Sequence, residues 1–420
     1  ELVCRPALAT AINTESERRL VLNAEGDWEV AEKPDWCELS VMSGSKKTEL
    51  RLTIKQMSRG AEAREGDIVF RLKDKDYTTR CHVTQYDYEY AEDEIITLQE
   101  HTKGNGVNLV FLGDGYSALD ISKGEYMKMI REQVERFFDI EPYQTYLDYF
   151  NVYTGIAVSP ESGIGTINTI RYTRFETTYT GGVGLRCDYD AAFAYALEMP
   201  TVNKGNLNQT LIIMTPNSTD YGGICQMWDD GSAIAFCPLS DYGYPLDSRG
   251  VIQHEAGGHG FGKLGDEYIY HNEFIDFCGC TCCGHVWEFN YAKALGWYEN
   301  LSLTGKMHEV PWAHFIFDDR YSDVVDIYEG GFMHNRGVFR SEQNSCMNND
   351  IPYYSAISRE AIVKRIMAYA GETYSFEKFV ENDKRDAMES QSRSVDRPGV
   401  TVRGYQYAPR IHKGKPDILK

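Results

Sequence analysis

Two histidines that lie five residues apart, His254 and His259, constrain the fold of this chain more than any other feature of its sequence. Each residue of a regular α-helix turns the chain by about 100°, so side chains five residues apart point about 140° away from each other. The intervening Gly257 and Gly258 tolerate a distorted backbone, and a π-type turn absorbs one inserted residue. We therefore expect a π-type turn or bulge from the first histidine to the second, with both imidazole rings in one cleft.

The residues around this turn are those of a catalytic zinc site. Neutral imidazoles are preferred ligands of Zn²⁺, so we expect His254 and His259 to bind the metal. Glu255 lies between them and is expected to act as the general base of a metal-dependent hydrolase. The acidic residues Asp266 and Glu267 follow His259 a short distance along the chain and are candidates for a third ligand.

The composition excludes some classes of partner. The chain has 420 residues, 42% of them hydrophobic, and a formal net charge of −20. This charge argues against nucleic acid and anionic membranes as partners, because both repel an acidic surface. No apolar run approaches the ~20 residues that a membrane-spanning helix needs, so no membrane span is expected.

The hydrophobic pattern divides the chain into an all-β part and an α/β part. Residues 1–90 are expected to form an all-β domain, because segments such as 49–55 alternate apolar and polar residues as half-buried strands do. Turn-rich segments such as Ser43–Ser45 are expected to separate the strands. Residues 91–104 are expected to be a linker, and residues 105–420 a catalytic domain.

The second part combines buried strands with helices. Residues 108–112 and 211–214 are short apolar runs, which are typical of buried strands. Apolar residues recur at helical spacing over residues 126–138 and again over residues 357–369. The last twenty residues are basic and contain two prolines, which favours a loosely packed tail.

A sequence pattern in the first part carries a first resemblance. It consists of Trp28 and Trp36, then Arg64-x-Gly66-x-Ile68, then a predicted strand that ends at Gln85. This pattern resembles the BACON-type immunoglobulin-like modules of secreted bacterial proteins. The resemblance implies an immunoglobulin-like β-sandwich for the N-terminal domain.

A series of short motifs between residues 105 and 370 carries a second resemblance. In chain order the motifs are Leu112-Gly113-Asp114-Gly115-Tyr116; Glu141-Pro142 with Asn151-Val152-Tyr153; Ser159-Pro160-Glu161-Ser162-Gly163-Ile164; the histidine motif through Asp266-Glu267-Tyr268; Val310-Pro311-Trp312; Tyr328-Glu329-Gly330-Gly331; and Asn344-Ser345-Cys346-Met347. Motifs in this order resemble the IgA-peptidase-like zinc metallopeptidases, which are secreted bacterial endopeptidases. The more common histidine spacing in that family is four, so this chain departs from it by one inserted residue.

The second resemblance implies a fold and a function. The fold is an α/β zincin-like catalytic domain, with a twisted sheet and an active-site helix, that follows the immunoglobulin-like domain. The function is zinc-dependent hydrolysis of a protein or peptide, with His254 and His259 as zinc ligands and Glu255 as general base. The expected location is outside the cell or at the bacterial cell surface, including attachment by a lipid anchor before processing.

The third zinc ligand has several candidates. Metzincins place it six residues after the second histidine, where this chain has Gly265, which cannot coordinate a metal. Asp266, one residue further on, is therefore the expected ligand, and Glu267, His271 and His285 are the alternatives. Asp266 could instead form a hydrogen bond to a ligand imidazole and orient it without binding the metal itself.

Other residues near the motif have two interpretations each. Met347 is similar to the Met-turn beneath the zinc of metzincins, or is an ordinary core methionine, and its role is packing in both cases. Arg336 and Arg340 either hold a substrate carboxylate or the developing oxyanion, or form structural ion pairs. Tyr268 or Tyr328 could donate a hydrogen bond to the oxyanion.

The cysteines suggest covalent links rather than a second metal site. The chain has 11 cysteines, an odd number, so at least one is unpaired within it. Cys280 and Cys283 have the spacing of one half of a structural zinc site, but no second pair lies at the usual distance. Disulfides from the cluster at residues 278–283 to Cys225 or Cys237 are expected if the protein is secreted.

Two further functions compete with a zinc endopeptidase. One is a glycan- or protein-binding surface module whose zincin domain is degenerate and inactive, and the inserted residue favours it. The other is a zinc hydrolase that acts on a non-peptide amide. Metal content together with hydrolysis of a denatured protein separates the binding module from the peptidase.

Overall fold

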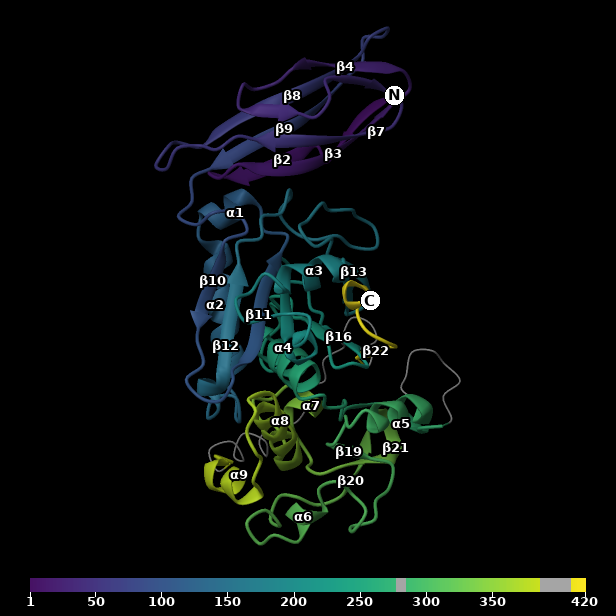
Figure 1. Ribbon diagram of the computed structural model, residues 1–420. Helices are drawn as coiled ribbons and strands as arrows, with labels where there is room; N and C mark the ends of the chain where they lie inside the picture. Colours follow the sequence, from purple (N-terminus) through teal and green to yellow (C-terminus); the bar gives the residue numbers. More distant parts are fainter. Residues whose placement is uncertain (277–284, 386–408) are drawn as a thin grey trace. The chain divides into compact units, whose positions relative to one another are not determined.

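The structure is a computed structural model that describes residues 1–276, 285–385 and 409–420 (Figure 1). The described chain forms two compact units. The first consists of Glu1–Ile96, Gly113–Ile130 and Gly155–Thr178, and the second of Thr97–Leu112, Arg131–Thr154 and Tyr179–Lys420. The chain therefore enters each unit more than once.

Two sheets make up most of the first unit. Their strand orders are β1-β3-β7-β5 and β2-β9-β8-β4-β6. The strands are β1 (Leu2–Arg5), β2 (Leu8–Ile12), β3 (Ser16–Ala24), β4 (Asp27–Glu32), β5 (Cys37–Leu39), β6 (Ser43–Ser45), β7 (Thr48–Ile54), β8 (Arg64–Leu72) and β9 (Thr78–Tyr86). Neighbours are antiparallel except β2 and β9, which are parallel. The strand predicted at residues 49–55 is confirmed as β7.

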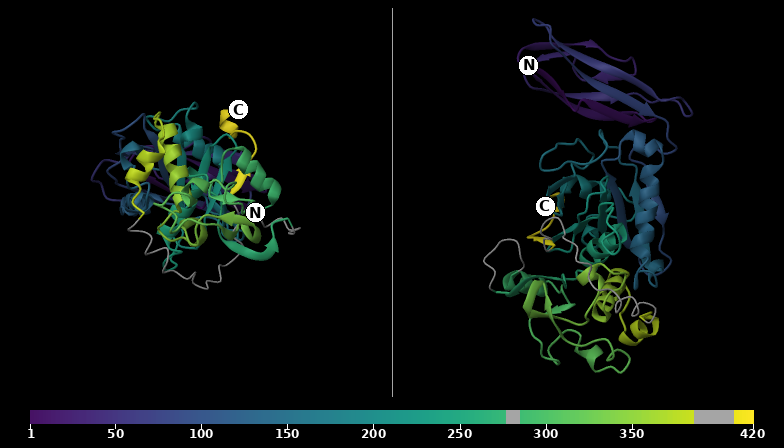
Figure 2. Two further views of the ribbon diagram at one scale, coloured as in Figure 1. Left: turned by 90° about the horizontal axis from the view of Figure 1, so that it is seen from below. Right: turned by 180° about the vertical axis from the view of Figure 1, so that it is seen from behind.

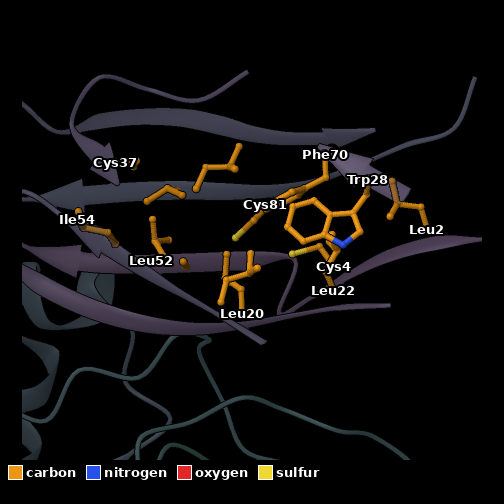
Figure 3. Packing of buried hydrophobic residues seen from close by; sticks show 14 of the residues in the cluster. Leu2, Cys4, Leu20, Leu22, Trp28, Cys37, Leu52, Ile54, Phe70 and Cys81 are labelled. Atoms are coloured by element: carbon orange, nitrogen blue, oxygen red, sulfur yellow. The ribbon is translucent and has the colours of Figure 1, made fainter. Parts of the chain in front are cut away.

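The inner faces of these two sheets share one hydrophobic core (Figure 3). Trp28 packs edge-on against Phe70 with 5.8 Å between the ring centroids. Leu20 and Leu52, on neighbouring strands of the other sheet, are fully buried in the same cluster. Burial of each such side chain stabilises the fold by about 1.5–3 kcal/mol. The period-two alternation of the sequence thus determines which face of each strand enters the core.

One predicted turn is wrong. Ser43–Ser45 was expected to separate strands, but it forms the short edge strand β6, which pairs with β4. Gly44 lies so close to the ring of Trp28 that a Cβ atom there would come within 2.8 Å of it. A glycine that reads as a turn residue is needed here for close packing.

A seven-stranded mixed sheet runs through the second unit (Figure 1, Figure 2). Its order is β10-β12-β11-β15-β17-β16-β22. The strands are β10 (Ile95–Gln99), β11 (Val107–Asp114), β12 (Phe150–Gly155), β15 (Leu211–Pro216), β16 (Ile224–Trp228), β17 (Ala233–Phe236) and β22 (Arg410–His412). β16 is antiparallel to β17. Every residue of the five central strands is buried, which confirms the buried strands predicted at 108–112 and 211–214.

Two strands of this sheet lie where none was expected. β10 falls within residues 91–104, predicted as a linker, and β22 falls within the C-terminal segment predicted as a loosely packed tail. The ring of His412 stacks on Trp228 at 4.7 Å, and its carbonyl accepts a hydrogen bond of 3.0 Å from the Asp229 N–H. Strands this short contain too few residues for a recognisable alternation of apolar and polar side chains. Their pairing partners, and not their own sequence pattern, hold them in place.

Helices and a smaller sheet complete the structure. The helices are α1 (Ala118–Ser122), α2 (Glu125–Phe138), α3 (Tyr189–Ala196), α4 (Ser248–Ile252), η3 (Gln253–Phe261), α5 (Val286–Ala294), α6 (Ala313–Ile316), α7 (Cys346–Asn349), α8 (Ala356–Tyr369) and α9 (Phe376–Asn382). The small sheet contains β18 (Ile269–Phe274), β19 (Leu301–Ser302), β20 (Tyr328–Gly331) and β21 (Met333–Arg340), and β13 (Thr178–Gly181) pairs with β14 (Gly184–Arg186). The helices predicted at 126–138 and 357–369 are confirmed as α2 and α8. Among the described residues, no helix combines the length and apolar character that crossing a bilayer requires. The chain is thus a mixed α/β protein with several sheets.

Candidate functional site

The histidine motif forms a π-helix. Helix α4 continues without a break into η3, a π-helix over Gln253–Phe261. Its hydrogen bonds span five residues, as in the 3.0 Å bond from the Gly262 N–H to the Gly257 carbonyl. Residues five apart therefore return to nearly the same side, and the ring centroids of His254 and His259 lie 4.8 Å apart. This confirms the predicted π-type turn.

Glycines allow other side chains to pack directly on this turn. A Cβ atom on Gly257 would lie 2.4 Å from the hydroxyl oxygen of Tyr354, and one on Gly258 would lie 2.2 Å from the sulfur of Met347. Any larger residue would displace these buried neighbours. Met347 thus touches the helix that carries both histidines, and its role is packing, as the sequence suggested.

Two tyrosines secure the carbonyl groups of the widened helix. The Tyr143 hydroxyl donates a hydrogen bond of 2.6 Å to the Gly257 carbonyl, and the Tyr354 hydroxyl donates one to the Gln253 carbonyl. Both tyrosines are fully buried. A typical hydrogen bond contributes about 0.5–1.5 kcal/mol net, so these bonds stabilise the irregular helix.

Three potential ligand atoms converge beside this helix. The Nε2 atoms of His254 and His259 each lie 3.0 Å from Oδ1 of Asp266. All three side chains are buried, and Asp266 is fully enclosed. Ligand atoms 2.0–2.2 Å from a tetrahedral Zn²⁺ lie about 3.3 Å apart, so the observed separations match a metal site after a small adjustment.

The hydrogen bonds behind the rings place Nδ1 of each histidine away from the point where the three side chains meet. Nδ1 of His254 lies 3.0 Å from the Cys346 carbonyl, and Nδ1 of His259 lies 2.7 Å from the Leu264 carbonyl. A carbonyl only accepts, so each Nδ1 carries a proton, and Nε2 is the nitrogen of each ring that can bind a metal when the ring is neutral. In the described part of the chain, Oδ2 of Asp266 has no hydrogen-bond partner. This donor set fits a cation.

Electrostatics in the site favour a positive charge at the same point. Burial by itself lowers the pKa of His254, but the carboxylates of Asp350 and Asp266 raise it well above its usual value. Burial would raise the pKa of Asp266, yet the two imidazoles hold it well below the usual range. A cation at this point would be compatible with an ionised carboxylate and two imidazoles in a buried space.

The alternative third ligands lie elsewhere. The carboxylate of Glu267 accepts a hydrogen bond of 2.9 Å from the Asn300 amide and another from the Ser345 hydroxyl. His271 is on strand β18, and His285 precedes helix α5. Among the described residues, the histidine, cysteine and acidic side chains close enough to share one ion are His254, His259 and Asp266.

Glu255 faces a cleft next to the three converging atoms. It is the one residue from 251 to 268 that is not buried. The cleft is lined by Val183, Tyr221, Gly222, Gly223, Val251, His254, Glu255, Tyr268 and Asp350. Burial raises the pKa of Glu255 to about 7, against the smaller opposing effect of His259 and His254. A carboxyl group with such a pKa can both take up and release a proton near neutral pH.

The walls of the cleft hold Glu255 and His254 closely. A Cβ atom on Gly223 would lie 3.0 Å from Cγ of Glu255, so a larger residue there would press on this side chain. The ring of Tyr268 stacks on that of His254 with 6.0 Å between centroids. Burial raises the pKa of Tyr268 well above its usual value, and Asp266 adds to this effect, so the hydroxyl stays protonated and can donate.

Two residues of the site were not expected from the sequence. Gly223 belongs to no recognisable motif, and its importance follows only from its contact with Glu255. Asp350 lies 2.7 Å from Nδ1 of His254 through Oδ1. It follows Met347 by three residues, but an aspartate in a polar turn gives no signal that it will meet a distant histidine.

Arg336, Arg340 and Tyr328 do not line the cleft. Arg340 is buried and donates a hydrogen bond of 2.7 Å to the Gly330 carbonyl, which is a structural role. Arg336 is exposed on strand β21. Of the two tyrosines considered as donors, Tyr268 is therefore the one at the site.

The predicted disulfides to Cys225 and Cys237 are wrong. Both residues are buried free thiols on or beside the central strands. Burial raises the pKa of Cys225, which disfavours the reactive thiolate. The cysteines at residues 278–283, including the Cys280–Cys283 pair, lie outside the described residues.

Comparisons with solved structures give weak likenesses. A Bacteroides ovatus GH5 xyloglucanase in complex with a XXXG heptasaccharide is 11% identical, with 52% of this chain and 56% of that chain covered and a TM-score of 0.20. A protein of unknown function from Porphyromonas gingivalis W83 is 15% identical, with coverage of 27% and 58% and a TM-score of 0.19. The chain thus spans little more than half of each. Scores this low do not establish a shared fold, and no curated protein matches the chain.

A family model gives the informative comparison. The model of the IgA Peptidase M64 family matches residues 96–290. The matched segment contains Glu255 and the converging side chains of His254, His259 and Asp266, together with the π-helix. The segment that carries the site is therefore similar to the IgA-peptidase-like metallopeptidases.

Proposed function

We propose that the protein is a zinc-dependent endopeptidase, with His254, His259 and Asp266 as zinc ligands and Glu255 as general base. One observation carries the proposal: the two Nε2 atoms lie 3.0 Å from the same carboxylate oxygen, in a buried site that opens to a cleft beside Glu255. Similarity to a peptidase family supports a protein or peptide as substrate.

The proposed chemistry divides between the ion and the side chains. When bound, Zn²⁺ supplies Lewis acidity that lowers the pKa of a water molecule to about 7 and polarises the substrate carbonyl. Glu255 accepts the proton of the attacking water and delivers it to the leaving amine. Its pKa near 7 suits both steps, because the carboxylate is a strong enough base and the carboxylic acid a strong enough donor.

Tyr268 is the proposed donor to the oxyanion. It lines the cleft, and its hydroxyl stays protonated up to high pH. A donor that is held rigidly in a partly dry site stabilises developing negative charge by several kcal/mol without reorganisation. Stacking against His254 keeps the ring in place.

The fold and location complete the proposal. We propose that the seven-stranded sheet and the helix with the histidines form a zincin-like domain, and that the two sheets of residues 1–86 form an immunoglobulin-like sandwich. The resemblances of both parts to secreted bacterial proteins support a location outside the cell or at its surface. The domain boundaries at 1–90, 91–104 and 105–420 are part of the same proposal, with β10 included in the middle segment.

The experiment combines metal content with hydrolysis. The purified protein is analysed for zinc, then incubated with a denatured protein before and after treatment with a chelator. The proposal requires bound zinc and internal cleavages that stop on chelation and resume when zinc is restored. Zinc without cleavage would support a binding module. The inserted residue no longer favours that alternative, because the π-helix accommodates it.

A further inference from the structure

A second carboxylate stands behind the first histidine of the site. Oδ1 of Asp350 lies 2.7 Å from Nδ1 of His254, closer than the Cys346 carbonyl at 3.0 Å. The other histidine differs, since Nδ1 of His259 contacts the Leu264 carbonyl at 2.7 Å. Nδ1 of His254 therefore contacts a negatively charged carboxylate, whereas Nδ1 of His259 contacts a neutral carbonyl.

The fold fixes the position of Asp350 through its backbone. Asp350 ends helix α7 in the left-handed conformation, with φ of 58°, and its N–H donates to the Cys346 carbonyl at 3.0 Å. Its carbonyl accepts a hydrogen bond of 3.0 Å from the Arg249 guanidinium. Gly250 lies directly beneath, where a Cβ atom would come within 3.1 Å of Cβ of Asp350. These contacts leave the carboxylate to His254 and the cleft.

A carboxylate on Nδ1–H changes what the ring can do. It fixes the tautomer with the proton on Nδ1 and sets the angle of the ring about its bond to Cβ. Its negative charge also makes Nε2 of His254 a stronger electron-pair donor than a carbonyl partner would. Loss of such a group typically lowers metal affinity by about 10–100-fold.

We propose that Asp350 is the positioning residue of His254 and strengthens the binding of the metal through the charge of its carboxylate. This inference rests on the proposed function, because it requires a metal at His254, His259 and Asp266. Asp350 itself is no ligand of that metal: its carboxylate meets the ring at Nδ1, whereas Nε2 faces Asp266, and the group that can share one ion does not include it.

Two substitutions separate the charge from the backbone. Asn keeps the size of the side chain and tolerates the left-handed conformation, so D350N removes the charge alone. Gly adopts the same conformation without strain, so D350G removes the whole side chain. D241N, an exposed aspartate in the same unit, is the matched control for the loss of one negative charge.

The measurements are zinc affinity by competition with a chelator, the visible spectrum of the Co²⁺-loaded protein, and the unfolding free energy of the chelator-treated protein. We expect D350N and D350G to bind zinc about 10–100-fold more weakly than the wild type and D241N. The cobalt bands should shift in both Asp350 variants. The unfolding free energy without metal shows whether each variant is folded, whereas the cobalt bands report on the metal site itself, which a purely structural role would not change.

The possible outcomes are distinct. Wild-type zinc affinity in D350N would overturn the inference, whether or not D350G binds weakly, because the charge would then contribute nothing. Failure of the wild-type protein itself to bind zinc would overturn the proposed function instead. Weakened zinc affinity in both Asp350 variants, with an unchanged control, would support the inference.

Discussion

His254 and His259 lie five residues apart in the sequence, yet their ring centroids are 4.8 Å apart and both rings meet Asp266. The π-helix over Gln253–Phe261 brings this about, because its hydrogen bonds span five residues and side chains five apart return to nearly the same side. The inserted residue therefore changes the helix and leaves the convergence of the two rings intact.

Glu255→Gln should abolish most hydrolysis and leave the metal in place. Gln has the same size but cannot accept the proton, so we expect the rate to fall by about 10² or more, the usual scale for loss of a general base. The measurement is kcat on a denatured protein alongside zinc content. E198Q, an exposed glutamate, serves as control. Loss of zinc together with activity would mean that Glu255 is a ligand and that its assigned role is wrong.

Gly258→Ala should destabilise the protein through Met347. The new Cβ atom would lie 2.2 Å from the methionine sulfur, and overpacking of this kind costs about 1–3 kcal/mol. Met347→Ala should remove the clash, so the double variant should be more stable than the sum of the single effects implies. Urea unfolding of the four proteins measures this coupling. Strict additivity would show that Met347 does not press on the helix.

Glu342→Gln should alter how stability depends on pH. Burial raises the pKa of Glu342 to about 7, although Arg359 and the hydrogen bond from Tyr353 oppose the shift. A raised folded-state pKa favours folding below the unfolded value of about 4.5, and this contribution is lost as the pH rises through about 7. The wild type should therefore lose up to about 3 kcal/mol relative to the Gln variant over that range.

Urea unfolding at pH 5 and pH 8 tests the effect of Glu342. The unfolding free energy of E342Q minus that of the wild type should be larger at pH 8 than at pH 5. E198Q, at an exposed position, should follow the wild type. An unchanged difference between E342Q and the wild type at both pH values would show that Glu342 is not held in the protonated form.

Much of this site could be predicted because its signals are local. The histidine spacing and the two glycines specify the π-turn, and the acidic pair follows within the same stretch. Asp350 could not be predicted, because its contact with His254 depends on a left-handed helix end and on a hydrogen bond from the Arg249 guanidinium to its carbonyl. Gly223 likewise matters only through contact with Glu255, which the sequence does not record.

The fold shows the same division. Long alternating or helical patterns predicted β7, α2 and α8 correctly, because burial of one face determines them. The short strands β10 and β22 were missed, since their hydrogen-bond partners lie far away in the chain. Strand β6 was missed because its glycine and serines are typical of a turn. The disulfides to Cys225 and Cys237 were expected from the presumed location of the protein, but both cysteines are enclosed as free thiols.

The zinc content of the purified protein tests the central claim most directly. After dialysis against metal-free buffer, elemental analysis compares the wild type with a variant that carries both His254→Ala and His259→Ala. We expect one zinc per wild-type chain and none in the double variant, with the two-sheet N-terminal part still folded. A wild-type protein that holds no zinc, or a double variant that retains it in full, would show that His254 and His259 do not bind the metal.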